Sequence, residues 1–487
     1  MDKLKIGLIG SSQLSFPGDK EGAFGRTSAK IAELAQKWDF ELYIYPKQVI
    51  TAEDGYDARS ALEKEKADFV LLQCTSFSSG FLAPIFARTK NARLGLWAIP
   101  EGASQGAVPF NSLCSINMFS AIIGHYLSDY KLPLKWFYGD ADAPLFKERF
   151  HITVKVLKAI KSMQHSSIAL IGGVAPGFDD LYDDERKTIK LFDGMRINRL
   201  HEYDELKKLA LSMDGTKVNA RMAEEASWAK NFRHPTAKKM LEVNARFALA
   251  YEQFVAENNY DALAISCWPK FQEDFLYSVC AVVGELNDKG TVAACEGDIT
   301  SAISMLFLKY LSNDIPTLMD LSAFDEKDDT VLLWHCGPTS RRYCEKNGFE
   351  YGLNYSGWAH EPNEIEVSGT GVVRDMVMDP GEVTIARITG ESDRMFLASG
   401  RIINSDKPSF HGSRGWVGNL EINRQKVSAL DFLNTVLVQR FQHHFPIVRG
   451  NFSKEVMEAT AWLGMGKVEI TPYQDYLENP AWWPNRP

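Results

Sequence analysis

Residues 293–337 read AACEGDITSAISMLFLKYLSNDIPTLMDLSAFDEKDDTVLLWHCG, and this stretch decides how we interpret the rest of the chain. A short β-like run ends in an acidic tripeptide with Glu296 and Asp298, and an apolar helix pattern follows it. A lone acid, Asp320, and a second apolar run that ends at His335 complete the stretch. Asp298 suits the N-cap of the predicted helix. Glu296 and Asp320 have no such local role, and a buried carboxylate needs a cation or hydrogen bonds to offset its desolvation.

The regions on either side of this stretch predict three domains. The chain has 487 residues, which is too many for one compact core. Residues 1–162 alternate apolar runs with helical patterns, and residues 163–314 repeat that rhythm, which is typical of parallel sheets. The predicted helix, residues 299–311, then leads into residues 315–487, whose short β-branched runs predict an antiparallel sheet or barrel. We therefore expect two doubly wound, Rossmann-like α/β domains followed by a β-rich, barrel-like C-terminal domain.

The last part of the chain is predicted to contain helices. Helical patterns cover residues 429–441 and 454–463, and the adjacent histidines His443 and His444 lie between them. On a helix the side chains of adjacent residues diverge. We therefore expect only one of these two rings to face a site.

Composition and charge exclude several classes of protein. The apolar fraction of 45% and the charged fraction of 24% are ordinary for a globular protein and exclude a largely disordered one. The net charge of −9, without a dense run of Lys and Arg, argues against nucleic acid and anionic membranes as partners. The sequence has no apolar run of about 18 residues, so it predicts no membrane-spanning helix. The start, MDKLKIGLIGSS, reads as a buried strand rather than a signal peptide, so we expect a cytoplasmic protein.

Two motifs that would indicate other kinds of site are missing from the sequence. The 7 cysteines are scattered without CxxC spacing, which favours reduced thiols over a disulfide framework or a zinc site. The glycines after the first predicted strand, GLIGSS, do not form GxGxxG. A dinucleotide site is therefore not predicted there.

Glu296, Asp320, His335 and His444 are the residues whose chemistry has to be considered together. Two carboxylates with one or two imidazoles suit a divalent ion such as Mn²⁺ and leave positions open for substrate oxygens. Taken singly, each residue has a simpler explanation, because an acid near a strand end is usually hydrogen-bonded or solvated and a single histidine is usually a core residue. The residue pattern alone therefore leaves a metal site and a structural role both open.

The order of CWPKFQ, ACEGD, TLMD, WHCG and QHHF resembles the pattern of the L-fucose isomerase and L-arabinose isomerase superfamily of metal-dependent aldose–ketose isomerases. The resemblance is most specific over residues 260–450, and the remainder matches only in its α/β rhythm. It implies that Glu296, Asp320 and His444 bind Mn²⁺, or another divalent cation such as Mg²⁺ or Co²⁺. It also implies that Gln272 contacts the substrate.

The resemblance leaves the role of His335 and the identity of the sugar open. His335 looks like the extra histidine of the arabinose isomerases, which the fucose isomerases lack, and would bind the metal or a substrate hydroxyl. Asp320 is of the fucose isomerase type, whereas the chain length is near that of the arabinose isomerases. The substrate would be L-fucose, D-arabinose, L-arabinose or a relative, or a C6-modified hexose such as sulfoquinovose if an arginine points into the site.

The implied reaction accounts for this set of residues. Moving a carbonyl group from C1 to C2 requires removal of the C2 proton, a cis-enediolate, and return of a proton to C1. A metal ion would stabilise the developing oxyanion as a Lewis acid, and Glu296 and Asp320 would be both ligands and the proton-transfer pair. An enediolate-type epimerase or aldolase is the alternative enzyme, and a non-catalytic sugar-binding protein is the further alternative.

Sugar recognition needs aromatic faces and polar groups. The candidates are Trp268, Trp334, Trp358, Trp416, Arg341, Arg342, Arg401 and Arg414. Of these, Trp268 and Arg414 are our predicted substrate contacts. Several members of the superfamily complete the site with the first domain of a neighbouring subunit, and the segment GLWAIPEG, with Trp97 and Glu101, is the candidate for that role here. The resemblance thus implies a homo-oligomer, a trimer or a hexamer.

Overall fold

The computed structural model describes residues 3–102, 104–275, 277–354, 370–404 and 407–480. Trp358, one of the predicted sugar-binding tryptophans, lies outside these residues. The chain forms two compact units, residues 1–161 with 461–464 and residues 162–460 with 465–487. Among the described helices, none is long and apolar enough to cross a membrane.

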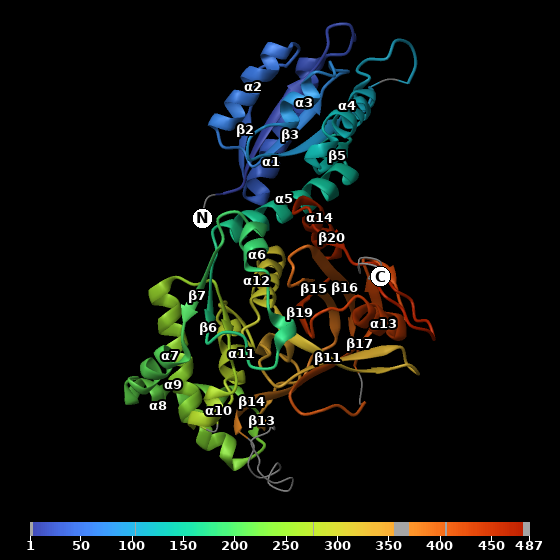
Figure 1. The fold of residues 1–487 in the computed structure, drawn as a ribbon. Coiled ribbons are helices and arrows are strands. Elements are labelled where there is room, and N and C mark those ends of the chain that lie inside the picture. Colours follow the sequence, from blue (N-terminus) through green and yellow to red (C-terminus); the bar gives the residue numbers. More distant parts are fainter. Residues whose placement is uncertain (1–2, 103, 276, 355–369, 405–406, 481–487) are drawn as a thin grey trace. The chain divides into compact units, whose positions relative to one another are not determined.

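The first unit is built on a parallel sheet of five strands in the order β2-β1-β3-β4-β5. Its strands are β1 (Lys5–Ser11), β2 (Glu41–Ile44), β3 (Phe69–Cys74), β4 (Arg93–Ala98) and β5 (Leu134–Tyr138). Its helices are α1 (Lys20–Trp38), α2 (Ala52–Lys64), α3 (Leu82–Ala87), α4 (Ser112–Tyr126) and α5 (Pro144–Gln164). Strand β3 is buried along its whole length, because helices flank the sheet (Figure 1), and it therefore reads as an apolar run in the sequence.

The second unit contains another parallel sheet, with four strands in the order β10-β9-β6-β7. Its strands are β6 (Ser167–Ile171), β7 (Arg196–His201), β9 (Ala262–Ile265) and β10 (Val292–Ala294). Its helices are α6 (Glu185–Leu191), α7 (Tyr203–Leu211), α8 (Gly215–Trp228), α9 (Pro235–Asn258), α10 (Lys270–Phe275) and α11 (Cys280–Asp288). The structure therefore confirms the two predicted parallel α/β sheets.

A barrel of six antiparallel strands follows in the same unit. The strands pair in the order β16-β15-β19-β11-β12-β17, and a pairing between β17 and β16 closes the barrel. They are β11 (Thr317–Asp325), β12 (Thr330–His335), β15 (Gly381–Ile388), β16 (Arg394–Ile402), β17 (Ser413–Ile422) and β19 (His444–Arg449). The remaining elements of this part are β8 (Asn231–Phe232), β13 (Glu350–Asn354), β14 (Thr370–Val377), β18 (Gln425–Lys426), β20 (Gly466–Lys467), α13 (Ala429–Val438) and α14 (Ser453–Trp462). The predicted barrel is confirmed.

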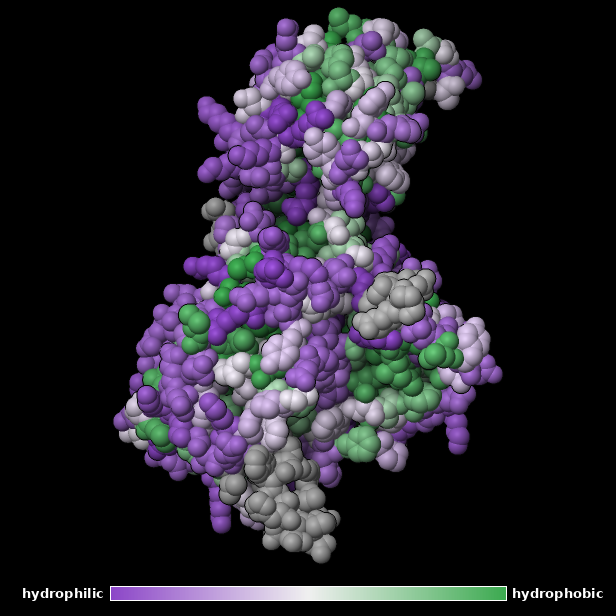
Figure 2. Space-filling model, in the orientation of Figure 1, coloured by the Kyte–Doolittle hydropathy of each residue, from purple (hydrophilic) through white to green (hydrophobic). Residues whose placement is uncertain are grey.

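The inside of the barrel is filled by alternate residues of its strands. Met319, Leu333, Ile385, Phe396 and Ile447 come from five different strands and are all buried in one apolar cluster. Burial of each such side chain stabilises the fold by roughly 1.5–3 kcal/mol. Over the molecule as a whole, hydrophilic side chains predominate on the face shown in Figure 2, with a group of hydrophobic ones at the lower right. The short β-branched runs made the C-terminal part recognisable as antiparallel β-structure.

Helix α12, Ile299–Ser312, joins β10 to β11 and confirms the helix predicted for residues 299–311. Asp298 caps it, because its carboxylate accepts the N–H of Ser301 (2.9 Å), and Asn313 ends it in the left-handed conformation (φ 54°). The helix is apolar nearly all round because it packs against β9 and β10 on one side and against the barrel strands β15 and β19 on the other. It therefore ties the parallel sheet to the barrel.

The predicted helical surroundings of His443 and His444 are wrong. Helix α13 ends at Val438, Arg440 takes the left-handed conformation (φ 60°), and His444 is the first residue of β19. Strand β19 pairs with β11 and β15 and places Phe445 in the barrel core. The sequence pattern favoured a helix that continues beyond Val438, but packing inside the barrel favours a strand from His444.

Candidate metal and substrate site

Glu296 follows the carboxyl end of β10 and lies in a turn whose backbone takes the left-handed conformation. Glu296 and Gly297 both have positive φ values, 62° and 74°. A Cβ at position 297 would lie 2.1 Å from the carbonyl oxygen of Gly173, so a glycine is required there. The N–H of Ala175 donates to the carbonyl oxygen of Glu296 (2.9 Å) and holds the turn. The Gly in the acidic tripeptide thus serves to place the Glu296 side chain in the cavity described below.

The register of the barrel brings Asp320 next to the two histidines. Asp320 on β11 is paired with Trp334 on one side and with His444 on the other. His335 follows Trp334 at the end of β12. Three neighbouring strands therefore deliver one carboxylate and two imidazoles to the same end of the barrel.

Glu296 joins this group from the parallel sheet. Its Oε2 lies 3.3 Å from His444 Nε2 and 3.2 Å from His443 Nε2. Asp320 Oδ1 lies 3.8 Å from His444 Nε2. Ligand atoms of Glu296, His335 and His444 lie within 4.8 Å of one another, and so do those of Asp320, His443 and His444. The structure thus brings together the four residues singled out from the sequence and adds His443.

Two of the atoms in this group have no hydrogen-bond partner. Asp320 Oδ1 and His335 Nε2 are buried and unpaired within the described part of the chain, and a third atom, His444 Nε2, has only Glu296 Oε2 near it, at 3.3 Å. Buried polar atoms without partners are costly and rare, so they indicate a ligand that supplies the missing contacts. Carboxylate oxygens together with an imidazole nitrogen are a donor set that fits a divalent cation such as Mn²⁺.

His444 is held by a buried ion pair. Its Nδ1–H donates to Asp298 Oδ2 (2.9 Å), and the same oxygen accepts Arg387 Nη1 (2.8 Å). Neither Asp298 nor Arg387 is exposed to solvent. Arg387 also donates to the carbonyl oxygen of His444 (3.1 Å). Asp298 is thus both the predicted helix cap and the acceptor that orients His444, and sequence reasoning missed the second role.

The charges of the group shift its pKa values. Burial raises the pKa of Glu296, but hydrogen bonds from His443 and His444 outweigh burial and hold this pKa below its usual range. Burial lowers the pKa of His444, but hydrogen bonds to Asp298 and Glu296 raise it to about 10. Burial also lowers the pKa of His335. In the absence of a metal ion, His444 is therefore a cation between two carboxylates, and His335 is neutral at pH 7.

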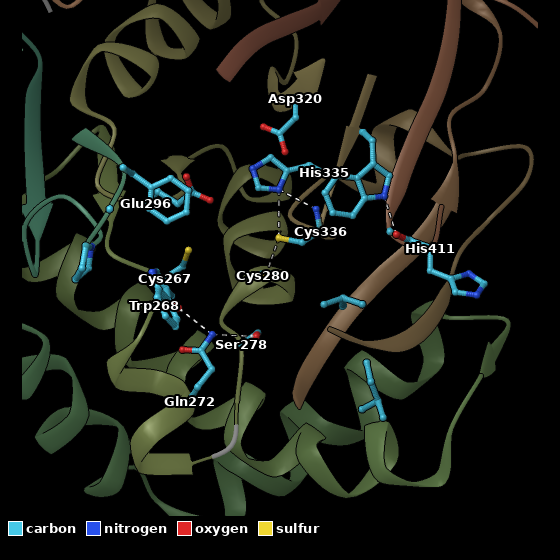
Figure 3. Close-up of a pocket in the computed structure, with 17 residues that line it drawn as sticks. Cys267, Trp268, Gln272, Ser278, Cys280, Glu296, Asp320, His335, Cys336 and His411 are labelled. Carbon is cyan, nitrogen blue, oxygen red and sulfur yellow. Dashed lines mark hydrogen bonds between the residues drawn. The ribbon is translucent and has the colours of Figure 1, made fainter. Parts of the chain in front are cut away.

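The group faces a cavity of about 700 Å³. Among its lining residues are Phe178, Cys267, Trp268, Gln272, Ser278, Cys280, Glu296, Asp320, Trp334, His335, Cys336 and His411. Figure 3 shows the ring of His335 between Asp320 and Glu296, with Trp268 and Gln272 below them. The Gln272 amide donates to Ser278 Oγ (3.2 Å), and its Oε1 is buried without a partner. The cavity therefore combines aromatic walls with a few unpaired polar atoms, as small-molecule sites do.

Two predicted substrate contacts lie elsewhere. Trp97 is fully buried in the core of the first unit, where its indole N–H donates to the carbonyl oxygen of Gly139 (2.8 Å). Its ring is therefore not presented to a neighbouring subunit, contrary to the prediction. Arg414 does not line the cavity either; it pairs with Asp375 and donates to the carbonyl oxygen of Gly412 (2.7 Å), which does line it.

The other candidates from the sequence also have structural partners. Arg341 pairs with Asp288 and Arg342 with Asp314. Neither of them is among the cavity-lining residues, nor are Arg401 and Trp416, whereas Trp334 is. The residues that sequence reasoning missed are His443 and Arg387. The adjacent histidines were a usable signal for His443, but Arg387 had none.

Comparison with known proteins finds distant relatives. A sulfoquinovose isomerase of Alkalicoccus urumqiensis is 25% identical over 438 residues, which cover 87% of this chain and 91% of that protein. One of Priestia aryabhattai is 25% identical over 429 residues, with 87% and 90% covered. One of Clostridium sp. (strain MSTE9) is 23% identical over 343 residues, with 69% and 71% covered. No protein-family model matches the chain.

The similarity to solved structures is too low to support a conclusion about this chain. A solute-binding protein of an ABC transporter from Agrobacterium vitis, bound with α-D-tagatopyranose, covers 64% of this chain and 90% of its own length at 12% identity. Its TM-score is only 0.18. The comparisons therefore establish a distant relation to sulfoquinovose isomerases and nothing finer.

Proposed function

We propose that this protein is a divalent-metal-dependent aldose–ketose isomerase that acts on a sulfonated hexose of the sulfoquinovose type. The observation that carries the proposal is the convergence of His444 with Glu296 and Asp320, which both line a sugar-sized cavity, together with the unpaired buried oxygen of Asp320. The distant relation to sulfoquinovose isomerases supports the reaction class and the substrate.

Glu296, Asp320 and His444 would hold the metal. Two carboxylates and one imidazole favour Mn²⁺, with Mg²⁺ and Co²⁺ as alternatives. When bound, such an ion supplies Lewis-acid stabilisation of the negative charge that develops on the substrate oxygens. Asp298 and Arg387 keep His444 oriented toward that position.

The carboxylates would also move the proton. In the proposed reaction the open-chain aldose loses its C2 proton, passes through a cis-enediolate and gains a proton at C1. Glu296 and Asp320 both reach the surroundings of His444 Nε2, at 3.3 and 3.8 Å, so they form the base and acid pair. The aromatic side chains of Trp268 and Trp334 in the cavity wall keep water away from the intermediate.

Substrate recognition would use the opposite parts of the cavity wall. We assign Gln272 to a sugar hydroxyl and Trp268 to the apolar face of the sugar. Among the described residues that line the cavity, the basic side chains are His335 and His411. His411 contacts Arg233, which makes that end of the cavity our proposed position for the sulfonate.

The setting of the enzyme is part of the same proposal. We propose that it works in the cytoplasm as a homo-oligomer, a trimer or a hexamer, with three domains over residues 1–162, 163–314 and 315–487. The resemblance to the sugar isomerase superfamily supports this assembly. Light scattering coupled to size-exclusion chromatography measures the number of subunits.

The test is an assay of sugars with protein freed of metal by EDTA and then supplied with Mn²⁺. The panel contains sulfoquinovose, L-fucose, D-arabinose, L-arabinose and D-glucose, which has a hydroxyl where sulfoquinovose has its sulfonate. We expect Mn²⁺-dependent conversion of sulfoquinovose to the ketose, with deuterium from D₂O incorporated at C1. Full activity without metal would refute the proposal. An epimerised aldose, or products of carbon–carbon cleavage, would identify an epimerase or an aldolase instead.

A further inference from the structure

His335, which lines the cavity, and His444, whose Nε2 lies beside Glu296, have opposite partners at Nδ1. His444 Nδ1 faces the carboxylate of Asp298 (2.9 Å), which only accepts hydrogen bonds. His335 Nδ1 faces the backbone N–H of Cys336 (2.8 Å), which only donates. These contacts keep a proton on Nδ1 of His444 and leave Nδ1 of His335 without one.

The contact at His335 fixes its proton at Nε2. An Nδ1 that accepts a backbone N–H has no proton of its own, and a neutral imidazole then carries its single proton on Nε2. The ring is buried, which disfavours the doubly protonated cation. The thiol of Cys336 also lies 3.2 Å from Nδ1 and can donate to it in the same sense.

The contact at His444 does the reverse. Asp298 keeps a proton on Nδ1. A metal ion would therefore bind at Nε2, through the lone pair of that nitrogen, and displace a proton held there. Nε2 of His444 also lies within reach of both carboxylates, 3.3 Å from Glu296 Oε2 and 3.8 Å from Asp320 Oδ1. His444 is therefore built as a ligand.

We infer that His335 is a hydrogen-bond donor to the substrate and not a metal ligand. Its Nε2–H is buried, has no partner among the described residues, and belongs to a ring that lines the cavity between Asp320 and Glu296 (Figure 3). A donor at this place meets a sugar oxygen and stabilises negative charge that develops there. The inference rests on the proposed function for the identity of the substrate, but the tautomer itself does not.

The first experiment separates the two roles by metal binding alone. Isothermal titration of Mn²⁺ into the metal-free full-length protein, without sugar, compares His335→Gln with His444→Gln. We expect His335→Gln to bind Mn²⁺ within about 3-fold of the wild-type affinity, and His444→Gln to lose about 30-fold or more. An equal loss in both variants would show that His335 is a ligand and overturn the inference.

The second experiment uses activity to test the donor. Glutamine keeps an N–H near the position of Nε2, whereas leucine fills the same space without a donor. We expect His335→Leu to lower kcat about 100-fold at unchanged Mn²⁺ affinity, and His335→Gln to recover part of that loss. Equal kcat values for the leucine variant and the wild type would refute a role in substrate binding.

The third experiment reads the tautomer directly and does not depend on the proposed function. The metal-free protein is labelled with ¹⁵N-histidine, and the signals of His335 are identified by their loss in His335→Gln. Protonated and unprotonated ring nitrogens have distinct ¹⁵N shifts, and we expect Nε2 to be the protonated one. A proton on Nδ1 of His335 would overturn the inference, whereas a wild-type protein that binds no divalent metal would overturn only the proposed function.

Discussion

The two parallel sheets have nearly the same strand order and very different strand ends. The first sheet runs β2-β1-β3-β4-β5 and the second β7-β6-β9-β10, so the strand order is the same except that the first sheet has one more strand, β5. In the first sheet, polar side chains near the strand ends form hydrogen bonds with one another. Ser78 Oγ donates to Ser11 Oγ (2.9 Å), and the Gln73 amide donates to Thr27 Oγ1 (2.9 Å). In the second, Glu296 and its neighbours end in a cavity with unpaired atoms.

The difference teaches that topology provides a place for a site but not the site itself. Parallel sheets offer a crevice at their carboxyl ends, and both sheets have one by construction. Among the described side chains of the first unit, Gln48 Oε1 is the single buried atom without a hydrogen-bond partner. The second unit leaves Asp320, His335, His444 and Gln272 with such atoms around one cavity. The second unit therefore differs from the first in the unpaired polar atoms that its barrel strands and the end of its parallel sheet bring to one cavity.

The largest effect should come from the acid that follows β10. Glu296→Gln removes a charge that faces His443 and His444, and we expect kcat to fall by about 1,000-fold or more together with the Mn²⁺ affinity. The matched variant is Glu63→Gln in α2 of the first unit, where the carboxylate accepts the N–H of Lys90 (3.0 Å).

For Glu63→Gln we expect a loss of stability of about 1 kcal/mol and wild-type Mn²⁺ affinity. Steady-state kinetics and titration calorimetry measure both variants. A loss of activity in Glu63→Gln as large as in Glu296→Gln would break the contrast between the two units.

The next effect concerns two helix caps that look alike in the sequence. Asp298 and Asp19 both cap helices, and asparagine caps as well as aspartate. Asp298→Asn also breaks the buried pair with Arg387, so we expect a loss of about 3–5 kcal/mol in unfolding free energy and a 10- to 100-fold weaker Mn²⁺ affinity. Asp19→Asn should change neither by more than experimental error. Denaturant unfolding measures the unfolding free energy of both variants. Similar losses in that free energy would show that Asp298 acts only as a helix cap.

The pH dependence of the metal-free protein should report the same site. The pKa of His444 is about 10 in the folded state, well above that of an unfolded histidine, so the folded state holds this proton more tightly. The resulting stability is fully present below about pH 6.5 and is lost as the pH rises through about 10, and we expect a loss of roughly 3–5 kcal/mol across that window.

Thermal unfolding of the wild type and of His444→Gln between pH 6.5 and 10 measures this effect. The variant lacks the titrating ring, so its stability should fall less over the same range. Parallel curves for the two proteins would place the titrating group elsewhere.

The smallest effect should come from Trp97. Trp97→Phe keeps the aromatic packing against Phe146 and removes only the hydrogen bond to Gly139, so we expect a loss of about 1 kcal/mol in stability. Mn²⁺ affinity and KM for the sugar should stay at wild-type values. A rise in KM without a change in stability would return Trp97 to the substrate site and blur the difference between the two units.

The candidate site was partly readable because its residues follow apolar runs. Glu296 follows the buried strand β10 and His335 is the last residue of the buried strand β12, so these two positions at element ends were visible in the sequence, whereas Asp320 lies within β11. The short β-branched runs of the C-terminal part were likewise enough for the antiparallel barrel. The histidine pair was misplaced because the helical pattern before it continues past the true end of α13.

The sequence by itself determined the three kinds of structure and the residue types of the site, because hydrophobic periodicity and helix caps are local properties. Only the tertiary structure decided which of those residues meet. The contact between Arg387 and Asp298 spans 89 positions, and that between His443 and Glu296 spans 147. Such contacts depend on strand register and on closure of the barrel, and the different partners at Nδ1 of His335 and His444 are single hydrogen bonds that no pattern of residues records.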